Sequence, residues 1–248
     1  MLHALGRAQS DRAWLITHDD VELSEPAALA FQGFCQRRLQ GEPVAYIVGC
    51  KPFFGMDLQV DQRVLVPRPD TETLVEWALT LDKTKTVLDM GTGSGAIALA
   101  LKSVRLDWQV TALDASSDAL AVAQINAKRL HLNVNFLQSS WFDALSNEKF
   151  DLIVCNPPYI VEGDWHMAAL AHEPKQALTS GADGLDDIRL IIQQAPDFLA
   201  SGGWLLLEHG FDQAVAVRDL LSERGFKEVQ SQLDLAGIER CSGGVWLE

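Results

Sequence analysis

The sequence has few cysteines, no long apolar run and no segment typical of export. Residues 1–10 contain no long apolar core, so no secretory signal is expected. The most apolar run, Ala96–Leu101, is far too short to span a bilayer. The cysteines show no paired spacing that would indicate a zinc site or a disulfide framework; they are Cys35, Cys50, Cys155 and Cys241. We therefore expect a cytoplasmic protein with reduced thiols, no bound metal and no membrane association.

Positive charge is also scarce. The chain has 20 Lys and Arg against 34 Asp and Glu, which gives a formal net charge of −14. A protein that binds nucleic acid through its phosphates needs a basic face, because phosphate neutralisation supplies most of that affinity. We therefore expect protein or small-molecule partners and no direct nucleic-acid contact. The 248 residues, 48% of them hydrophobic, suffice for one large domain and a small appendage.

The N-terminal residues show a helical pattern. Apolar side chains recur at helical spacing in residues 1 to about 40. Ser24-Glu25-Pro26 is a plausible helix start, with Ser24 as the cap and the proline in the first turn. Gly41-Glu42-Pro43 then ends the pattern. These features predict a small helical unit at the beginning of the chain.

A different composition follows in the next segment. Residues 44–67 are rich in strand-forming types, and Asp61-Gln62 is a candidate hairpin turn. Asp70 is a candidate cap for a helix over residues 71–81. Arg68 and Glu72 are spaced to pair across a helical turn and so brace the hairpin.

From Thr86 onward, predicted strands and helices alternate, which indicates an α/β fold with a parallel sheet and helices on both faces. The strand candidates are Thr86–Met90, Gln109–Asp114, Asn133–Gln138, Phe150–Cys155, Gly203–Glu208, Glu228–Leu233 and Glu239–Trp246. The helix candidates are Ala96–Ser103, Ser117–Arg129, Asp186–Leu199 and Asp212–Glu223. The last two strands have no helix between them, so they are expected to form an antiparallel hairpin at one edge.

A glycine-rich turn joins the first strand of this pattern to its helix. Glycines allow a close backbone approach to a ligand, but such a turn fits dinucleotides, phosphates and S-adenosylmethionine alike. No Gly-Lys-Ser/Thr is present, which speaks against a phosphate-loop NTPase. Asp89, before the turn, would repel a pyrophosphate and attract a sulfonium or ammonium group, and Asp114 ends the next strand where a carboxylate accepts ribose hydroxyls. Candidate cofactor residues are Asp89, Gly91, Thr92, Gly93, Ser94, Gly95 and Asp114; the alternatives are a dinucleotide site or a plain strand-to-helix turn.

Aromatic and histidine side chains beyond the third strand have two interpretations each. Trp141 is a candidate wall for an adenine base, or else an ordinary core or surface tryptophan. His166 and His172 are expected to be surface or structural residues, with proton acceptors as the alternative.

The most specific feature is the tetrapeptide Asn156-Pro157-Pro158-Tyr159, directly after the strand Phe150–Cys155. Ligands in open α/β sheets bind beyond the carboxyl ends of strands, where this segment should lie. Proline nitrogens donate no hydrogen bond, so the loop presents acceptors. The Asn156 oxygen and the Pro157 carbonyl can accept both hydrogens of a planar NH2 group, and Tyr159 can pack on its π-system. The alternative is a rigid loop without a ligand.

The chain resembles the release-factor glutamine methyltransferases (the HemK/PrmC type) over roughly residues 40 to 246. The matching segments are Gly41–Gly49, Phe53-Phe54-Gly55, Val64–Glu72, Leu88–Gly95, Gln138–Phe142, Asn156–Tyr159, Glu173-Pro174, Gly181–Leu185 and Leu206–Gly210. The resemblance implies a Rossmann-like, seven-stranded class I methyltransferase domain, a small helical N-terminal domain and a linking β-hairpin. It places these parts in residues 71–248, 1–43 and 44–70, with release-factor recognition in the first 43 residues.

The resemblance also implies an activity. The cofactor would be S-adenosyl-L-methionine, and the substrate the glutamine in the Gly-Gly-Gln motif of peptide chain release factors, with an effect on translation termination. Residues matching Gly91–Gly95, Asp114, Trp141 and Asn156 would contact the cofactor. Those matching Asn156, Pro157, Pro158 and Tyr159 would hold the glutamine, with Asn156, Pro157 and Tyr159 as the catalytic set.

The sequence departs from the family pattern at two places, and three alternative functions remain open. The segment before Gly41 is shorter than usual for the family, and Ser140 stands where the family often carries aspartate. The tetrapeptide is shared with adenine-N6 DNA or RNA methyltransferases. The ribosomal-protein glutamine methyltransferases are broadly similar but typically have Pro-Arg-Ser at Pro67-Arg68-Pro69. A cofactor-binding module without enzymatic activity is the third alternative.

Overall fold

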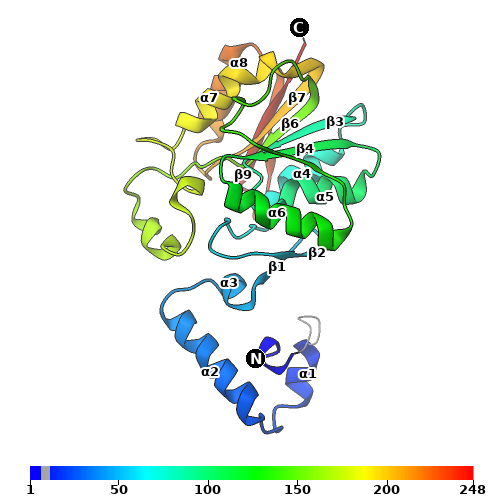
Figure 1. Cartoon of the computed structure of the whole chain (residues 1–248). Helices are drawn as coiled ribbons and strands as arrows, with labels where there is room; N and C mark the ends of the chain where they lie inside the picture. Colours follow the sequence, from blue (N-terminus) through cyan, green and yellow to red (C-terminus); the bar gives the residue numbers. More distant parts are fainter. Residues whose placement is uncertain (7–11, 248) are drawn as a thin grey trace.

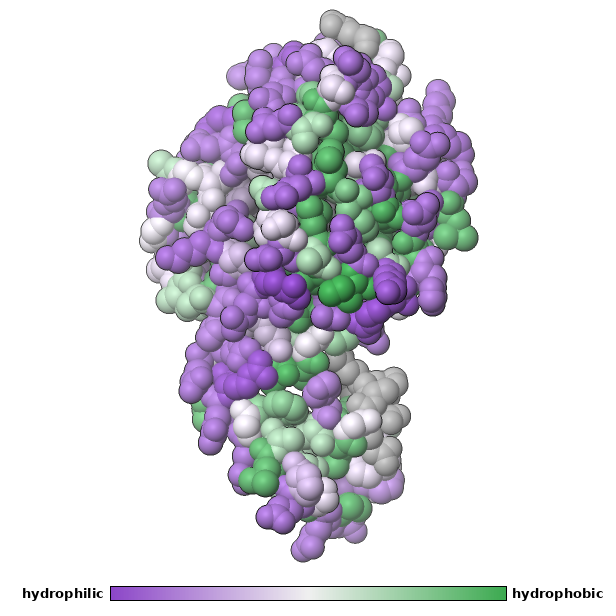
Figure 2. Space-filling model, in the orientation of Figure 1, coloured by the Kyte–Doolittle hydropathy of each residue, from purple (hydrophilic) through white to green (hydrophobic). Residues whose placement is uncertain are grey.

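The computed structural model describes residues 1–6 and 12–247 and shows a small helical unit joined to a larger α/β domain (Figure 1). The helical unit contains η1 (His3–Leu5), α1 (Arg12–Thr17) and α2 (Glu25–Leu39). The predicted start of α2 is confirmed: Ser24 occupies the N-cap position and Pro26 the first turn. Of the residues of α2 only Ala27 is buried, so this unit has little core of its own. Figure 2 accordingly shows apolar surface on this unit. The exposed apolar side chains of the unit include Ile16, Leu29 and Leu39.

The linking segment differs from the prediction at two places. Residues 44–67 are not extended throughout, because Val44–Val48 forms the short helix α3 directly after Pro43. The hairpin consists of β1 (Cys50–Phe53) and β2 (Met56–Gln59), and its turn is Phe54-Gly55 instead of Asp61-Gln62. Both turn residues have positive φ, 47° and 73°, as a tight two-residue hairpin turn with right-handed twist requires.

The α/β domain is built on a seven-stranded sheet with the strand order β5-β4-β3-β6-β7-β9-β8. The first five strands along the chain are parallel, and β9 runs antiparallel to both β7 and β8, so the predicted edge hairpin is confirmed. The strands are β3 (Thr86–Met90), β4 (Gln109–Asp114), β5 (Asn135–Gln138), β6 (Phe150–Cys155), β7 (Leu199–Glu208), β8 (Lys227–Leu233) and β9 (Glu239–Trp246).

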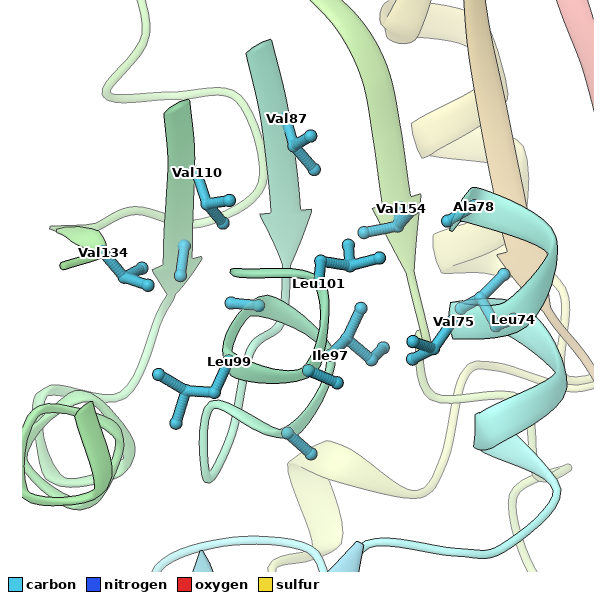
Figure 3. Close-up of a cluster of buried hydrophobic side chains, with 14 of the residues drawn as sticks. Leu74, Val75, Ala78, Val87, Ile97, Leu99, Leu101, Val110, Val134 and Val154 are labelled. Carbon is cyan, nitrogen blue, oxygen red and sulfur yellow. The ribbon is translucent and has the colours of Figure 1, made fainter. Parts of the chain in front are cut away.

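Helices cover both faces of this sheet, as predicted. One buried cluster joins α4 and α5 to the sheet through Leu74, Ile97 and Val154 (Figure 3), and a second joins α7 to the opposite face through Ile188 and Ile153. The residues of β6 from Leu152 to Cys155 alternate between the two clusters because side chains of a strand point to opposite faces. The helices are α4 (Thr71–Leu79), α5 (Ala96–Val104), α6 (Ser117–Leu130), α7 (Asp186–Gln194) and α8 (Ala214–Arg224), with the 3-10 helices η3 (Trp165–Leu170), η4 (Lys175–Ala177) and η5 (Ala195–Asp197).

Two helix ends were predicted too late: the helix expected over residues 71–81 ends at Leu79, and the larger difference is at α7. The helix expected over Asp186–Leu199 ends at Gln194, and η5 begins at Ala195. Pro196 lies within the predicted span, where it has no N–H to donate to the preceding turn. Within residues 1–6 and 12–247, no helix combines the length and the apolar character needed to cross a membrane.

The sheet register determines where the functional loops emerge. Met90, the last residue of β3, pairs with Leu113 of β4 on one side and with Cys155 of β6 on the other. Cys155 pairs in turn with Leu207 of β7. The loops that follow β3, β4, β6 and β7 therefore emerge at one edge of the sheet.

Candidate active site

A cavity of about 250 Å³ lies at the carboxyl edge of β3, β4 and β6. Its wall includes six of the residues predicted for the site, namely Gly91, Gly93, Asp114, Trp141, Asn156 and Pro158. The other six predicted residues, which are Asp89, Thr92, Ser94, Gly95, Pro157 and Tyr159, adjoin these along the chain and are not part of the wall. The two predicted pockets, for a cofactor and for a target group, are thus brought together at one cavity.

The glycine turn has the conformation that makes glycine necessary. Gly91 has a φ of 67°, and a Cβ atom there would lie 3.7 Å from the ring of Trp141. Gly95 is the N-cap of α5 with a φ of 85°, and a Cβ atom there would lie 3.0 Å from Leu99 Cδ1 and 3.2 Å from Ala123 Cβ. The turn therefore combines left-handed backbone with close packing that only glycine satisfies without strain.

Asp89 lies behind this turn and is completely buried. Its Oδ2 accepts hydrogen bonds from Thr92 Oγ1 (2.6 Å) and from the backbone N–H of Ala98 (3.1 Å). Its Oδ1 has no hydrogen-bond partner among the described residues. Burial raises the pKa of this carboxyl to about 7, although the two hydrogen bonds oppose the shift. Asp89 thus braces the turn from the inside and leaves one acceptor oxygen unused.

Asp114 ends β4 on the cavity wall. Its Oδ2 accepts from the N–H of Gly93 and its Oδ1 from the N–H of Ser116, each at 2.9 Å. Burial raises the pKa of the carboxyl, and these two bonds partly offset the rise. Both carboxylate oxygens are therefore oriented by backbone donors, and both donor residues also line the cavity.

Trp141 forms a flat wall next to the glycine turn. Its backbone is left-handed, with a φ of 45°, which is uncommon for a bulky residue. The indole Nε1–H donates to Asp187 Oδ1 at 3.0 Å, and the N–H of Asp187 donates to Ser180 Oγ at 2.8 Å. Asp187 also lines the cavity, so this carboxylate both fixes the indole ring and adds an acceptor to the wall.

The tetrapeptide residues are held by polar side chains of other elements. Asn156 Nδ2 donates to Thr71 Oγ1 at 3.3 Å, so the Asn156 oxygen points away from Thr71. The Tyr159 hydroxyl donates to Glu208 Oε1 at 3.3 Å, and burial raises the pKa of this phenol. The Tyr159 carbonyl accepts from Gln213 Nε2 at 3.1 Å. The loop is therefore rigid through its prolines and anchored at both ends.

The linker and the loop after the tetrapeptide meet over the cavity. Val64 and Leu65 line it from the linker, and Pro174 and Gln176 line it from the loop. Buried Glu173 joins the two segments, since its carboxylate accepts from Arg68 Nη2 (2.5 Å) and from the N–H of Val66 (3.0 Å).

The predicted pair of Arg68 with Glu72 is therefore wrong. Glu72 Oε1 accepts instead from the N–H of Phe54 in the hairpin turn, at 2.8 Å. The buried Glu173 carboxylate explains the difference, because a charge removed from water needs a charged partner more than an exposed one does. Glu72 still braces the hairpin, but its side chain bonds to the backbone of the hairpin turn and not to Arg68.

Several residues of the site were not singled out from the sequence. Thr71, Asp187 and Glu208 form hydrogen bonds with residues distant in the chain. Asn126 does so as well: it is 1% exposed and bonds to Gln59 and to the Ser94 carbonyl. The signal that was available for Glu208 is a charged residue at the end of the apolar strand Leu205-Leu206-Leu207. The exposed His166 bonds to Asp164 and His172 to the Gln40 carbonyl, and neither histidine lines the cavity.

Comparison with known proteins agrees with this architecture. The family model "Methyltransferase small domain" matches residues 69–230, and the model "PrmC N-terminal domain" matches residues 1–49. A methyltransferase structure from Pyrococcus furiosus, 18% identical, superposes with a TM-score of 0.59 and covers 88% of this chain and all of that one. The fold and the cavity at the carboxyl edge of the sheet thus define a class I methyltransferase.

Sequence identity to curated relatives identifies the family within this class. The release factor glutamine methyltransferase of Pseudomonas aeruginosa is 50% identical over 240 residues, which cover 95% of this chain and 87% of the relative. That of Coxiella burnetii is 44% identical over 236 residues, covering 94% and 85%. The chain belongs to the release factor glutamine methyltransferase family.

Proposed function

We propose that this enzyme transfers a methyl group from S-adenosyl-L-methionine to the side-chain amide nitrogen, N5, of the glutamine in the Gly-Gly-Gln motif of peptide chain release factors, and so modulates translation termination. The single observation that carries the proposal is Asn156 on the cavity wall with its amide nitrogen bound to Thr71. This contact leaves the amide oxygen to accept a hydrogen bond from a substrate NH2 group.

The cavity has donors and acceptors that suit the proposed cofactor. When bound, S-adenosyl-L-methionine supplies an electrophilic methyl group on a sulfonium. The Asp114 carboxylate would accept the ribose hydroxyls, and the backbone at Gly91 and Gly93 permits close approach. Trp141 would cover one face of the adenine, with the Ser140 hydroxyl as an uncharged acceptor beside it. Buried Asp89, with its unpartnered oxygen, adds negative charge behind the turn that favours a cationic ligand.

The target residues act by orientation. An amide nitrogen is a poor nucleophile because its lone pair is delocalised into the carbonyl group. Asn156 Oδ1 and the Pro157 carbonyl would accept its two hydrogens and hold the nitrogen in one position. These bonds strengthen as positive charge develops on the nitrogen. Pro157 and Pro158 add no competing N–H donor, and Tyr159 would pack on the flat amide.

We propose that the N-terminal helical unit takes part in recognising the substrate, in addition to the cavity. We assign residues 1–43 to release-factor recognition, residues 44–70 to the linker and residues 71–248 to the S-adenosylmethionine-dependent domain. The apolar surface of the N-terminal unit supports this role, since exposed apolar patches are typical of protein contact sites. Because release factors act on ribosomes, we propose the cytoplasm as the place of action.

The proposal is tested by incubating the purified protein with methyl-labelled S-adenosylmethionine and a release factor. We expect label on the wild-type factor and none on a variant with alanine in place of the motif glutamine. Equal labelling of both factors would rule out the assigned target. A ribosomal protein and an adenine-containing DNA or RNA serve as competing acceptors. Preferential label on the ribosomal protein would indicate a ribosomal-protein glutamine methyltransferase, and preferential label on the nucleic acid would indicate an adenine-N6 methyltransferase.

A further inference from the structure

A buried asparagine lies between the hairpin and the glycine turn of the cavity. Asn126 belongs to α6, which runs next to the hairpin (Figure 1), and it is 1% exposed. Its Oδ1 accepts from the N–H of Gln59 at 2.7 Å, and its Nδ2 donates to the Gln59 carbonyl at 3.0 Å. The same Nδ2 donates to the Ser94 carbonyl at 2.9 Å. One side chain thus joins the last residue of β2 to the turn before α5.

These three hydrogen bonds match what an asparagine amide offers. The amide has two N–H donors and a carbonyl acceptor; each donor meets a backbone carbonyl, and the acceptor meets a backbone N–H. Aspartate would supply acceptors only, and leucine, which is close in size, would supply neither. Asparagine is a poor helix former, so the two segments that it joins explain its presence inside a buried helix face. Without the amide, these backbone groups lose a partner in a place from which water is excluded.

The neighbouring residues of α6 contact the same two segments. Val122 shares a buried cluster with Val60 and Val64 of the linker. Ala123 packs on the glycine turn, since a Cβ atom at Gly95 would lie 3.2 Å from its Cβ. Both residues lie one helical turn before the asparagine and so share its face of the helix. Because Val64 also lines the cavity, this face of α6 lies between the linker wall of the cavity and the glycine turn.

We propose that Asn126 is a positioning residue that couples the hairpin linker to the cofactor site. The inference rests on the proposed function, since it requires the cavity to bind S-adenosyl-L-methionine. A cofactor that orders the glycine turn holds the Ser94 carbonyl in place for Asn126, and through Asn126 it holds the N–H of Gln59. Linkage is reciprocal, so a hairpin held in place also favours cofactor binding. The linker, which carries the N-terminal unit, therefore responds to the presence of the cofactor.

Hydrogen exchange in ¹⁵N-labelled wild-type protein, with and without saturating S-adenosylmethionine, tests this coupling without any substitution. We expect the cofactor to slow exchange of the Gln59 N–H about fivefold or more, the usual size of coupling between sites. The Phe54 N–H, bonded to Glu72 at the other end of the hairpin, is the internal control and should change much less. Equal slowing at the two amides, or none at Gln59, would overturn the inference.

The variant Asn126→Leu removes the three hydrogen bonds at nearly constant side-chain volume. Calorimetry well below the unfolding temperature should show the dissociation constant for S-adenosylmethionine increased roughly tenfold, while kcat at saturating cofactor stays within about threefold of wild type. Gln124→Leu, which removes an exposed amide from the same helix, should match wild type in both quantities. A purely structural residue would lower the fraction of folded protein, and with it kcat, without changing the dissociation constant of the folded fraction.

An unchanged dissociation constant in folded Asn126→Leu would overturn the inference. If this variant does not fold, the exchange measurement on wild-type protein decides. Wild-type protein that binds the cofactor but transfers no methyl group to a release factor would count against the proposed function alone, because neither the exchange nor the affinity measurement needs the acceptor. Wild-type protein that does not bind the cofactor would contradict both.

Discussion

At the scale of single residues, Asn156 is proposed to accept a hydrogen bond from the substrate amide, and Asp114 is proposed to bind the cofactor. Asn156 lies on the cavity wall with its nitrogen committed to Thr71, and Asp114 lies on the same wall with both oxygens directed by backbone N–H groups. Asp114 ends β4 and Asn156 follows β6, and β3 lies between these two strands in the sheet. Their roles are therefore separable by mutation: the first should affect turnover, and the second should affect cofactor affinity.

Replacing Asn156 by alanine removes the proposed acceptor without removing the cavity. We expect the barrier for methyl transfer to rise by about 3 kcal/mol, as when one preorganised polar contact is lost. Steady-state kinetics should show this in kcat, and calorimetry should show cofactor affinity close to wild type. Asn147→Ala, at an exposed position away from the cavity, serves as the control. Unchanged turnover in Asn156→Ala would contradict the assigned role.

Replacing Asp114 by alanine should weaken cofactor binding. A carboxylate that accepts two hydroxyls contributes roughly 1.5–3 kcal/mol through each charged hydrogen bond. We therefore expect the dissociation constant for S-adenosylmethionine, measured by calorimetry, to increase by roughly two to four orders of magnitude. Asp118→Ala removes an exposed carboxylate of the adjoining helix α6 and should leave the constant unchanged. An unaltered constant in Asp114→Ala would remove this residue from the site.

At the scale of elements, the linker is attached to the loop over the cavity by Arg68 and Glu173. The Glu173 side chain is 3% exposed and that of Arg68 is 35% exposed, so loss of Arg68 leaves a buried carboxylate without its cation. We expect Arg68→Met to lower the free energy of unfolding by about 1–3 kcal/mol, less than for a fully buried pair because Arg68 is partly screened by water.

Denaturant unfolding measures this change, and Lys85→Met provides the matched control. Lys85 forms an ion pair with Asp107 in which both side chains are more than half exposed, 66% and 60%. Such exposed pairs contribute little, so the control should be destabilised much less than Arg68→Met. Equal losses in the two variants would show that the contact between linker and loop is not structural.

How far the sequence predicts these elements depends on how local their signals are. The bounds of β3, β4, β6 and β9 were predicted as they are observed; β3, β4 and β6 are short runs rich in strand-forming residues. The Phe54-Gly55 turn was missed because a phenylalanine with positive φ is an uncommon turn residue. The contacts of Glu208 and Asp187 depend on sheet register and on packing between distant segments, which no local pattern encodes. The site roles of all the predicted residues stay predictions.

At the scale of the whole molecule, two buried carboxyls set part of the pH dependence of stability. Burial raises the pKa of Asp89 and of Glu208 to about 7, from 3.8 and 4.5. In the folded protein both groups hold their protons more tightly than in the unfolded chain. Their contribution to stability is therefore complete below about pH 4 and is lost as the pH rises through about 7.

The variant Glu208→Gln isolates one of these two groups. It should be more stable than wild type at pH 8, by roughly 1–3 kcal/mol, because a neutral amide carries no penalty for a buried charge. At pH 5 the difference should shrink, since Glu208 is then protonated in the folded protein. Thermal unfolding at the two pH values measures both differences. A stability difference that does not change with pH would mean that Glu208 does not titrate in this range.

The central claim is that Asn156 and the prolines after it present acceptors to a flat NH2 group at the cavity. Mass spectrometry of the glutamine-containing peptide of a release factor, after incubation with S-adenosylmethionine and this enzyme, tests it most directly. We predict one added methyl group on the glutamine side chain with wild-type enzyme and almost none with Asn156→Ala. An unmodified glutamine with folded, cofactor-binding wild-type enzyme would contradict the account.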